Sequence, residues 1–224
     1  MKRYITPLLA LSILTTAANA ELVKSYFKTG ELKAVTNYID GTDTKIKEGI
    51  KNGIEKVYYQ IGKIANKVNY IKDKRDGIMT WYHKEGWVIK TLNYKLGKLV
   101  GDEITYYKNG QIKAIAHYKN DYRDGEKKSF YKSGKLASTV NYIHGKKEGI
   151  QKEYFPDGKL YTQVLYKNNY KEGTQKWLNE NGKVINKIVY KMDRPLKIMK
   201  KVEETDNSQV TIDSIDFSPQ KMRD

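Results

Sequence analysis

The chain has 224 residues, of which 30% are charged, 39% belong to the hydrophobic set and 12% are aromatic. Tyrosine dominates the aromatic residues, which argues against a large aliphatic core of the kind that encloses an enzyme active site. The absence of Cys excludes disulfides, thiol nucleophiles and thiolate zinc sites. The net charge of +16 predicts a salt-dependent attraction to anionic surfaces.

Residues 1–20 have the features of a secretory signal peptide. Lys2 precedes an apolar stretch, and an Ala-Asn-Ala sequence that ends at Ala20 supplies the small residues a signal peptidase needs. Cleavage is expected between Ala20 and Glu21. The apolar stretch is shorter than the roughly 20 residues that span a bilayer, which favours cleavage over a retained anchor. We therefore expect an exported protein that is periplasmic, on the cell surface or secreted.

Two glycine series and one tyrosine series recur with a period of 24 residues. The first glycine of each unit is followed eight residues later by tyrosine; these pairs are Gly62 and Tyr70, Gly86 and Tyr94, Gly110 and Tyr118, Gly134 and Tyr142, Gly158 and Tyr166, and Gly182 and Tyr190. The second series runs from Gly53 to Gly173. Such regularity indicates tandem repeats. A seventh unit precedes these six and carries an insertion at about 40–51, so seven repeats are predicted over 21–194.

Each unit has the pattern of a β-hairpin. In the fourth unit, Lys108-Asn109-Gly110 is a turn sequence between two strand-like segments. In the second segment, the residues two, six and eight positions after the glycine are expected to share one apolar face. A single hairpin is marginal in water, so the units must pair side by side. The predicted fold is all-β, an elongated single-layer antiparallel sheet of tandem 24-residue hairpins.

The periodic pattern ends after about Tyr190, and residues 195–224 form a C-terminal segment of different composition. Residues 202–224 hold six acids against Lys221 and Arg223. Alternating apolar residues in 210–212 and 215–217 are consistent with a short strand that covers the open end of the sheet. A disordered tail is the alternative, and the sequence leaves both open.

The unit resembles the bacterial variant of the MORN repeat over about residues 22–194. The resemblance is carried by Tyr106-Tyr107-Lys108-Asn109-Gly110-Gln111-Ile112, Tyr118 and Asp124-Gly125, and again by Phe130-Tyr131, Gly134-Lys135-Leu136, Tyr142 and Glu148-Gly149. The third and seventh units depart from it, because His83 and Asn179 replace the second aromatic residue. The resemblance implies a role in protein or membrane interaction.

An aromatic ridge is predicted on the face of the hairpin opposite the apolar one. It consists of the residues three positions before the first glycine, and Trp81 or Trp177 lies two positions earlier in the units that lack this aromatic residue. The candidate binding residues are Tyr59, Trp81, Trp87, Tyr107, Tyr131, Phe155, Tyr161 and Trp177, with the flanking Lys113, Lys135 and Lys159. The alternative is that the ridge only packs against itself or the curve of the sheet.

The sequence predicts no catalytic residue, no metal site and no cofactor. The three histidines occupy unrelated repeat positions, and acids beside turn glycines, such as Asp124 and Glu148, are expected to be solvated. We expect a non-enzymatic scaffold that binds a protein or an anionic envelope, lipid or glycan surface, with self-association left open. Scarce Arg argues against nucleic acid. An antitoxin or immunity-like neutralising binder is the alternative, and an enzyme acting on lipid phosphate is the weaker third candidate.

Overall fold

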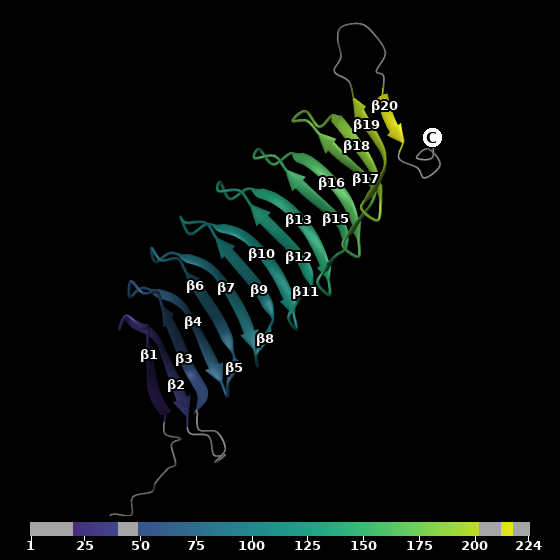
Figure 1. The fold of residues 1–224 in the computed structure, drawn as a ribbon. Helices are drawn as coiled ribbons and strands as arrows, with labels where there is room; N and C mark the ends of the chain where they lie inside the picture. Colours follow the sequence, from purple (N-terminus) through teal and green to yellow (C-terminus); the bar gives the residue numbers. More distant parts are fainter. Residues whose placement is uncertain (1–19, 40–48, 202–211, 217–224) are drawn as a thin grey trace, which may run out of the picture.

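The computed structural model describes residues 20–39, 49–201 and 212–216. All regular structure in these residues is β-strand, and the strands pair antiparallel into one sheet (Figure 1). Seven hairpins build it: β1 (Ala20–Tyr26) with β2 (Leu32–Ile39), β3 (Ile50–Tyr58) with β4 (Ile64–Ile71), β6 (Gly77–Tyr82) with β7 (Val88–Lys95), β9 (Gly101–Tyr106) with β10 (Ile112–Lys119), β12 (Gly125–Phe130) with β13 (Leu136–Ile143), β15 (Gly149–Tyr154) with β16 (Leu160–Lys167), and β17 (Tyr170–Leu178) with β18 (Val184–Lys191). The predicted single-layer antiparallel sheet of hairpins is confirmed.

Successive hairpins are joined by tight turns that lead into short strands. Four of these strands contain two residues each: β5 (Lys74–Arg75), β8 (Lys98–Leu99), β11 (Tyr122–Arg123) and β14 (Lys146–Lys147). The sheet ends with β19 (Arg194–Lys201) and β20 (Ile212–Asp216), which pair with each other. The predicted signal peptide up to residue 19, the part of the insertion at 40–48, and residues 202–211 and 217–224 lie outside the described residues.

The turn within each hairpin requires its glycine. In the fourth hairpin, the Gly110 N–H donates to the Tyr107 carbonyl at 2.9 Å, and Gly110 has a φ of 84°. A side chain is strained at such a φ, which explains why this position is always glycine. The first hairpin has the same bond, from Gly30 to Phe27 at 3.0 Å.

The turn between hairpins fastens each repeat to the one before it. Asn120 and Asp121 both have positive φ, 48° and 72°, as a type I′ turn requires. The Asp121 N–H donates to the Leu99 carbonyl at 3.0 Å, and Asp121 Oδ1 accepts the Leu99 N–H at 2.8 Å. The same reciprocal pair joins Asp73 to Lys51, Asn169 to Lys147 and Asp193 to Lys171.

The acids beside the second glycine series were predicted to be solvated, and Asp124 and Glu148 are only partly so. Both are half-buried. Asp124 Oδ2 accepts the His144 N–H at 3.3 Å, and Glu148 Oε2 accepts the Asn168 N–H at 2.9 Å. These carboxylates therefore receive the first amide of the turn that follows their own hairpin, so they fix that turn.

A bulge in every hairpin changes the predicted faces. In the fourth hairpin, Ile112 pairs with Tyr106 but Ala114 pairs with Thr105, so the register shifts by one residue at Lys113. The other six hairpins shift at the equivalent place. Because an extra residue interrupts the two-residue alternation, Ile112 lies on the opposite face from Ala114.

The prediction that the aliphatic residue two positions after the glycine shares a face with the tyrosine is therefore wrong. Ile112 and Tyr106 lie on one face, whereas Ala116 and Tyr118 lie on the other. Tyr107 lines the same hollow as Ala116 and so lies on the Tyr118 face. The prediction that the aromatic ridge lies opposite the tyrosines fails for the same reason. The ridge and the tyrosines share one face.

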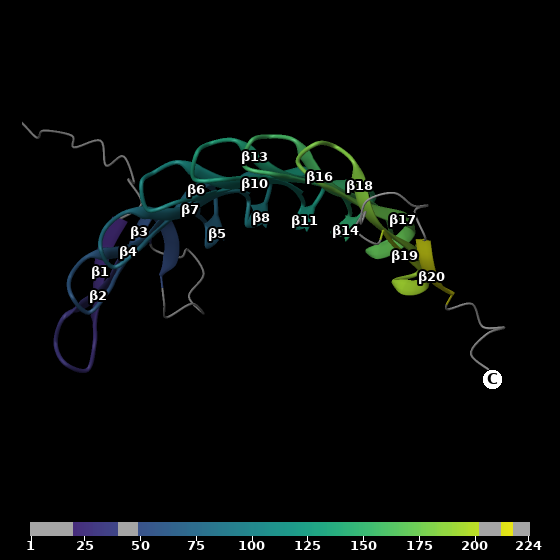
Figure 2. The same cartoon turned by 90° about the horizontal axis from the view of Figure 1, so that it is seen from above.

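The sheet is bowed along its length (Figure 2). Strands β5, β8, β11 and β14 lie beneath the arch, on its concave side. Arg75 of β5 and Arg123 of β11 lie over the rings of Tyr94 and Tyr118, at 5.3 and 5.6 Å. Val68, Val140 and Val164 on the tyrosine face are buried, whereas Ile78 and Ile150 on the other face are exposed, as expected for the inner and outer sides of a curved sheet. The face that carries the tyrosines and the aromatic ridge is therefore the concave face.

The most buried side chains also lie on the concave face. Val68 is only 1% exposed and packs with Met79 and Leu92. Tyr70 and Trp81 are among the partly buried residues that pack against this cluster. The core of this sheet is thus the packing of side chains from neighbouring repeats across one face.

Candidate functional site

A column of tyrosines runs along the concave face, and we call it the tyrosine column. It consists of Tyr70, Tyr94, Tyr118, Tyr142, Tyr166 and Tyr190, each paired across the strands with a glycine of the second series. Because the glycine has no side chain, its surface is free for the aromatic ring opposite. This pairing explains why both series share the 24-residue period.

A second column, of cations, lies against the tyrosine column. Its members are Lys51, Arg75, Arg123, Lys147 and Lys171, whose charged groups lie 4.5 to 5.6 Å from the centroid of a tyrosine ring in the column. In the third of these six repeats the equivalent position is occupied by Leu99, which packs against the Val68 cluster. Cation–π contacts of this kind orient a positive charge without neutralising it.

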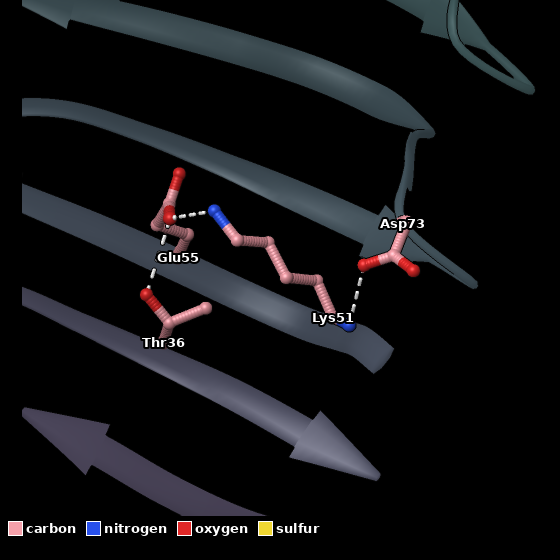
Figure 3. A network of polar contacts seen from close by, with 4 residues as sticks. All are labelled: Thr36, Lys51, Glu55 and Asp73. Atoms are coloured by element: carbon pink, nitrogen blue, oxygen red, sulfur yellow. Dashed lines mark hydrogen bonds and ion pairs between the residues drawn. The ribbon is translucent and has the colours of Figure 1, made fainter. Parts of the chain in front are cut away.

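At the N-terminal end, the cation column is compensated by acids. Lys51 Nζ lies 2.7 Å from Glu55 Oε1, and the Thr36 hydroxyl donates to the same oxygen at 3.1 Å (Figure 3). Burial opposes the charge on Lys51, but the bond to Glu55 still raises the pKa of Lys51 above its ordinary value. Asp73 accepts the Lys51 backbone N–H at 2.8 Å and completes the network in Figure 3.

The fourth repeat has a similar arrangement around Arg123. The Arg123 Nε–H donates to the Tyr118 hydroxyl oxygen at 2.9 Å, and that hydroxyl donates to Glu103 Oε2 at 2.7 Å. Burial, and then the bond to Glu103, raise the pKa of Tyr118. Glu103 Oε2 lies 4.0 Å from an Arg123 terminal nitrogen, so it offsets only part of the charge of Arg123.

Toward the C-terminal end, glutamine replaces the acid. Lys147 Nζ donates to Gln151 Oε1 at 2.9 Å, and Lys171 Nζ donates to Gln175 Oε1 at 3.1 Å. Neither lysine forms an ion pair within the described part of the chain. Burial, and then the like charge of Lys127, lower the pKa of Lys147. Glu153 lies on the same face and accepts the Gln151 Nε2–H at 2.8 Å. One acid offsets only part of the charge of Lys127, Lys147 and Lys171, so the C-terminal half of the concave face carries excess positive charge.

Lys127 occupies the fifth-repeat position equivalent to Glu103. It lies on the concave face of β12, opposite Val140, and is half-buried. It forms no hydrogen bond or ion pair with the described residues. Its charge therefore adds to those of Arg123 and Lys147.

A hollow of about 450 Å³ lies in the middle of the concave face, beside Lys127. Small side chains make the space: Ala114, Ala116, Ser129 and Ala137 line it. Other repeats carry larger groups at the same positions, as with Tyr161 in place of Ala137. The remaining lining residues include Tyr107, Tyr131, Lys113, Arg123 and the acid Glu103. Its volume is in the range of about 300–1,000 Å³ that ligand pockets have.

The tyrosines of the predicted ridge already have a structural task. The hydroxyl of Tyr59 donates to the Tyr82 carbonyl at 2.7 Å, and that of Tyr107 donates to the Phe130 carbonyl at 2.6 Å. Tyr131 donates to the Tyr154 carbonyl in the same way. These bonds link adjacent repeats and fix the orientation of the rings, which are half-buried.

The rest of the predicted ridge packs in pairs. Trp87 stacks on His83 with centroids 4.8 Å apart, and Tyr161 meets Phe155 edge-on at 4.9 Å. Lys113 lies 5.8 Å from the Tyr107 ring centroid. Trp81 and Trp177 lie on the same concave face, while Lys135 and Lys159 are exposed at the turns. The structure thus brings the predicted residues together along one side of the concave face.

Sequence reasoning missed the cation column and Lys127. The signal was present, because each member of the column stands two residues before a glycine of the second series. In a chain with 42 Lys and Arg, however, one periodic subset is hard to separate from solvated surface charge. The faces became clear only once the bulge was known.

The convex face is different in character. Exposed aliphatic residues stand on it, including Ile78 at 64% and Ile150 at 52% exposure. His117 and Asp102 form a pair on this face at 3.0 Å. No group of three or more potential metal ligands occurs in the described ranges. The same ranges include no helix that could cross a membrane.

Solved structures give only remote likenesses. The Tc holotoxin pore of Photorhabdus luminescens matches over 89% of this chain with 10% identity and a TM-score of 0.26, and the match covers 12% of that chain. A porin-like protein from Bacteroides uniformis matches with 9% identity and a TM-score of 0.22, over 89% of this chain and 95% of its own. Similarity at this level carries no functional meaning.

The repeats themselves match a known family model. No curated protein matches the chain. The model for the MORN repeat variant matches six tandem spans, residues 51–72, 75–96, 99–120, 123–144, 147–168 and 171–192. Each span begins at a cation-column position and ends in a tight turn, so the model covers one full repeat of the sheet. The chain therefore belongs to the MORN repeat variant family.

Proposed function

We propose that this protein is an exported, non-enzymatic docking scaffold that binds a partner through its concave face. The observation that carries the proposal is the excess of positive charge beside fixed aromatic rings at Lys127, Lys147 and Lys171. Interfaces are enriched in tyrosine and tryptophan, and complementary charge speeds association and sets specificity. The partner is a protein or an anionic component of the cell envelope.

Two features support docking rather than a general coating by charge. The rings are held by hydrogen bonds to neighbouring repeats, so little side-chain entropy is lost when a partner binds. Lys147 and Lys171 of the concave face lie against tyrosine rings and bond to glutamines rather than to acids, whereas Lys128 of the convex face is paired with Glu126 at 3.1 Å. A partner therefore meets different surfaces on the two sides of the sheet.

Two triple variants with the same net charge test the proposal. One changes the concave Lys127, Lys147 and Lys171 to Glu, and the other changes the convex Lys128, Lys152 and Lys176 to Glu. Purified residues 21–224 of each are used to retain proteins and envelope fractions at about 0.15 M ionic strength, where the screening length is about 8 Å. We expect the concave variant to lose at least about 90% of the retained partner and the convex variant to keep it. Equal loss in both would show that net charge alone explains binding.

Export is tested on the mature protein. N-terminal sequencing is expected to begin at Glu21, after removal of residues 1–20. A mature chain that begins at Met1 would contradict export by this route.

A further inference from the structure

The spacing of the cation column defines the shape of the ligand that would match it. Arg123, Lys147 and Lys171 occupy the same position in consecutive repeats. Each repeat contributes two paired strands, so neighbouring members of the column are about 10 Å apart along the sheet. A ligand that follows the column must present one negative charge at about this interval.

A polypeptide in the polyproline II conformation has this interval. It makes one turn in about three residues with a rise of about 3.1 Å per residue, so every third side chain points the same way at about 9 Å spacing. In an extended β-strand, by contrast, positions three apart point to opposite sides. A carboxylate at every third position of a polyproline II segment would therefore meet one cation per repeat.

The hollow beside Lys127 selects the kind of ligand. Alanines line much of it, at positions 114, 116 and 137, so it suits an apolar side chain better than a polyhydroxylated sugar. A flat bilayer would touch the rims of the arch in Figure 2 and leave the concave floor unfilled. A second, shallower depression follows between Lys147 and Lys171, lined by Tyr166, Tyr190 and Asp193, whose Oδ1 is already occupied by the Lys171 N–H. Peptide chemistry fits this path best.

We propose that the concave face binds an acidic segment of a partner protein in a polyproline II-like conformation, with acids at every third position and one apolar side chain in the central hollow. This inference rests on the proposed function. The carboxylates lie along Arg123, Lys147 and Lys171, and Lys127 contacts the segment next to the hollow. The rings and cations already have fixed orientations in the free protein, so little side-chain entropy is lost when the segment binds.

The test uses a labelled peptide of Glu-Pro-Pro repeats in which one central proline is replaced by phenylalanine. A permuted peptide of the same composition, with its glutamates contiguous, is the ligand control. Binding to residues 21–224 is measured by fluorescence anisotropy at about 0.15 M ionic strength. We expect the periodic peptide to bind at least about tenfold more tightly than the permuted one, because only the periodic one matches the column.

Three variants test the site itself. Lys127→Glu is expected to weaken binding of the periodic peptide at least about tenfold, and Lys128→Glu, its neighbour on the convex face, by less than about twofold. Ala137→Tyr is expected to weaken binding about tenfold or more, because it fills the hollow and leaves the charge unchanged. It should fold normally, since Tyr161 occupies the equivalent position and packs against Phe155.

Three results would overturn the inference. Equal affinity for the two peptides would show that only net charge matters. An equal loss of peptide affinity in Lys127→Glu and Lys128→Glu would show that the peptide does not bind specifically to the concave face. Binding of heparin or of vesicles rich in phosphatidylglycerol, with no binding of the periodic peptide, would assign the face to a polysaccharide or a lipid. If the concave triple variant still loses its natural partner in that case, the proposed function stands and only the peptide assignment fails.

Discussion

Replacing Tyr142 with alanine is expected to reduce the free energy of unfolding by about 3 to 5 kcal/mol, the range for truncating a buried large aromatic side chain. Tyr142 is 8% exposed and is the most buried member of the tyrosine column. It pairs with Gly125, and the Arg123 guanidinium lies 5.7 Å from its ring centroid. Its removal would open a gap at the junction of two repeats, where no second layer can close over it.

Urea denaturation followed by circular dichroism measures this effect, and Tyr122→Ala is the matched control. Tyr122 is 57% exposed, in the neighbouring short strand β11. Its replacement is expected to change stability by less than about 0.5 kcal/mol. A loss below about 1 kcal/mol for Tyr142→Ala would mean that the concave packing contributes little to the fold.

Deletion of one whole period should leave a folded protein, and deletion of half a period should not. Removing residues 99–122 takes out 24 residues and joins Lys98 to Arg123, which then takes the place of Leu99. All later strands keep their direction and their faces. In a repeat array of this kind stability is roughly a sum of repeat and neighbour terms, so the shortened protein should unfold cooperatively at a lower temperature.

Removing residues 99–110 deletes β9 and its turn instead. Strands β7 and β10 both pair antiparallel with β9, so they run in the same direction. A tight turn cannot join parallel strands, and the sheet could not continue. We expect this variant to aggregate or to lose its cooperative transition by circular dichroism and gel filtration. If both deletions fold equally well, or neither folds, the repeat would be defined wrongly.

Much of the fold follows from spacing alone. The 24-residue period, the turn at Lys108-Asn109-Gly110 and the alternation in residues 112–118 are local signals, and one sheet of paired hairpins satisfies all of them. The family resemblance rests on these same residues and is confirmed by the match to six spans. The fold could be predicted from the sequence because every repeat carries the same turn and strand pattern.

The faces could not be read correctly because they depend on a single extra residue. The bulge at Lys113 has no distinct composition, and the equivalent residues include Lys, Ala and Tyr. Counting by two from the turn glycine therefore assigned Ile112 to the wrong face. The ridge residues do share one face, but their relation to Tyr118 was reversed; their role in binding stays a prediction.

The charged part of the site was hidden for a different reason. Whether Lys147 is neutralised depends on the residue four positions later, which is Gln151 here and Glu55 in the equivalent place beside Lys51. That difference matters only when the two side chains are known to meet on the same face. The hollow likewise required the structure, since it arises where Ala114 and Ala137 come from different hairpins.

The most direct test of the docking surface is radical footprinting of the protein alone and bound to its captured partner. The account predicts that partner binding protects the concave residues Tyr131, Phe155 and Trp177 from oxidation and leaves the convex Ile78 and Ile150 unchanged. Protection of Ile78 and Ile150 with no change at the concave aromatic residues would contradict it, and would move the docking surface to the other side of the sheet.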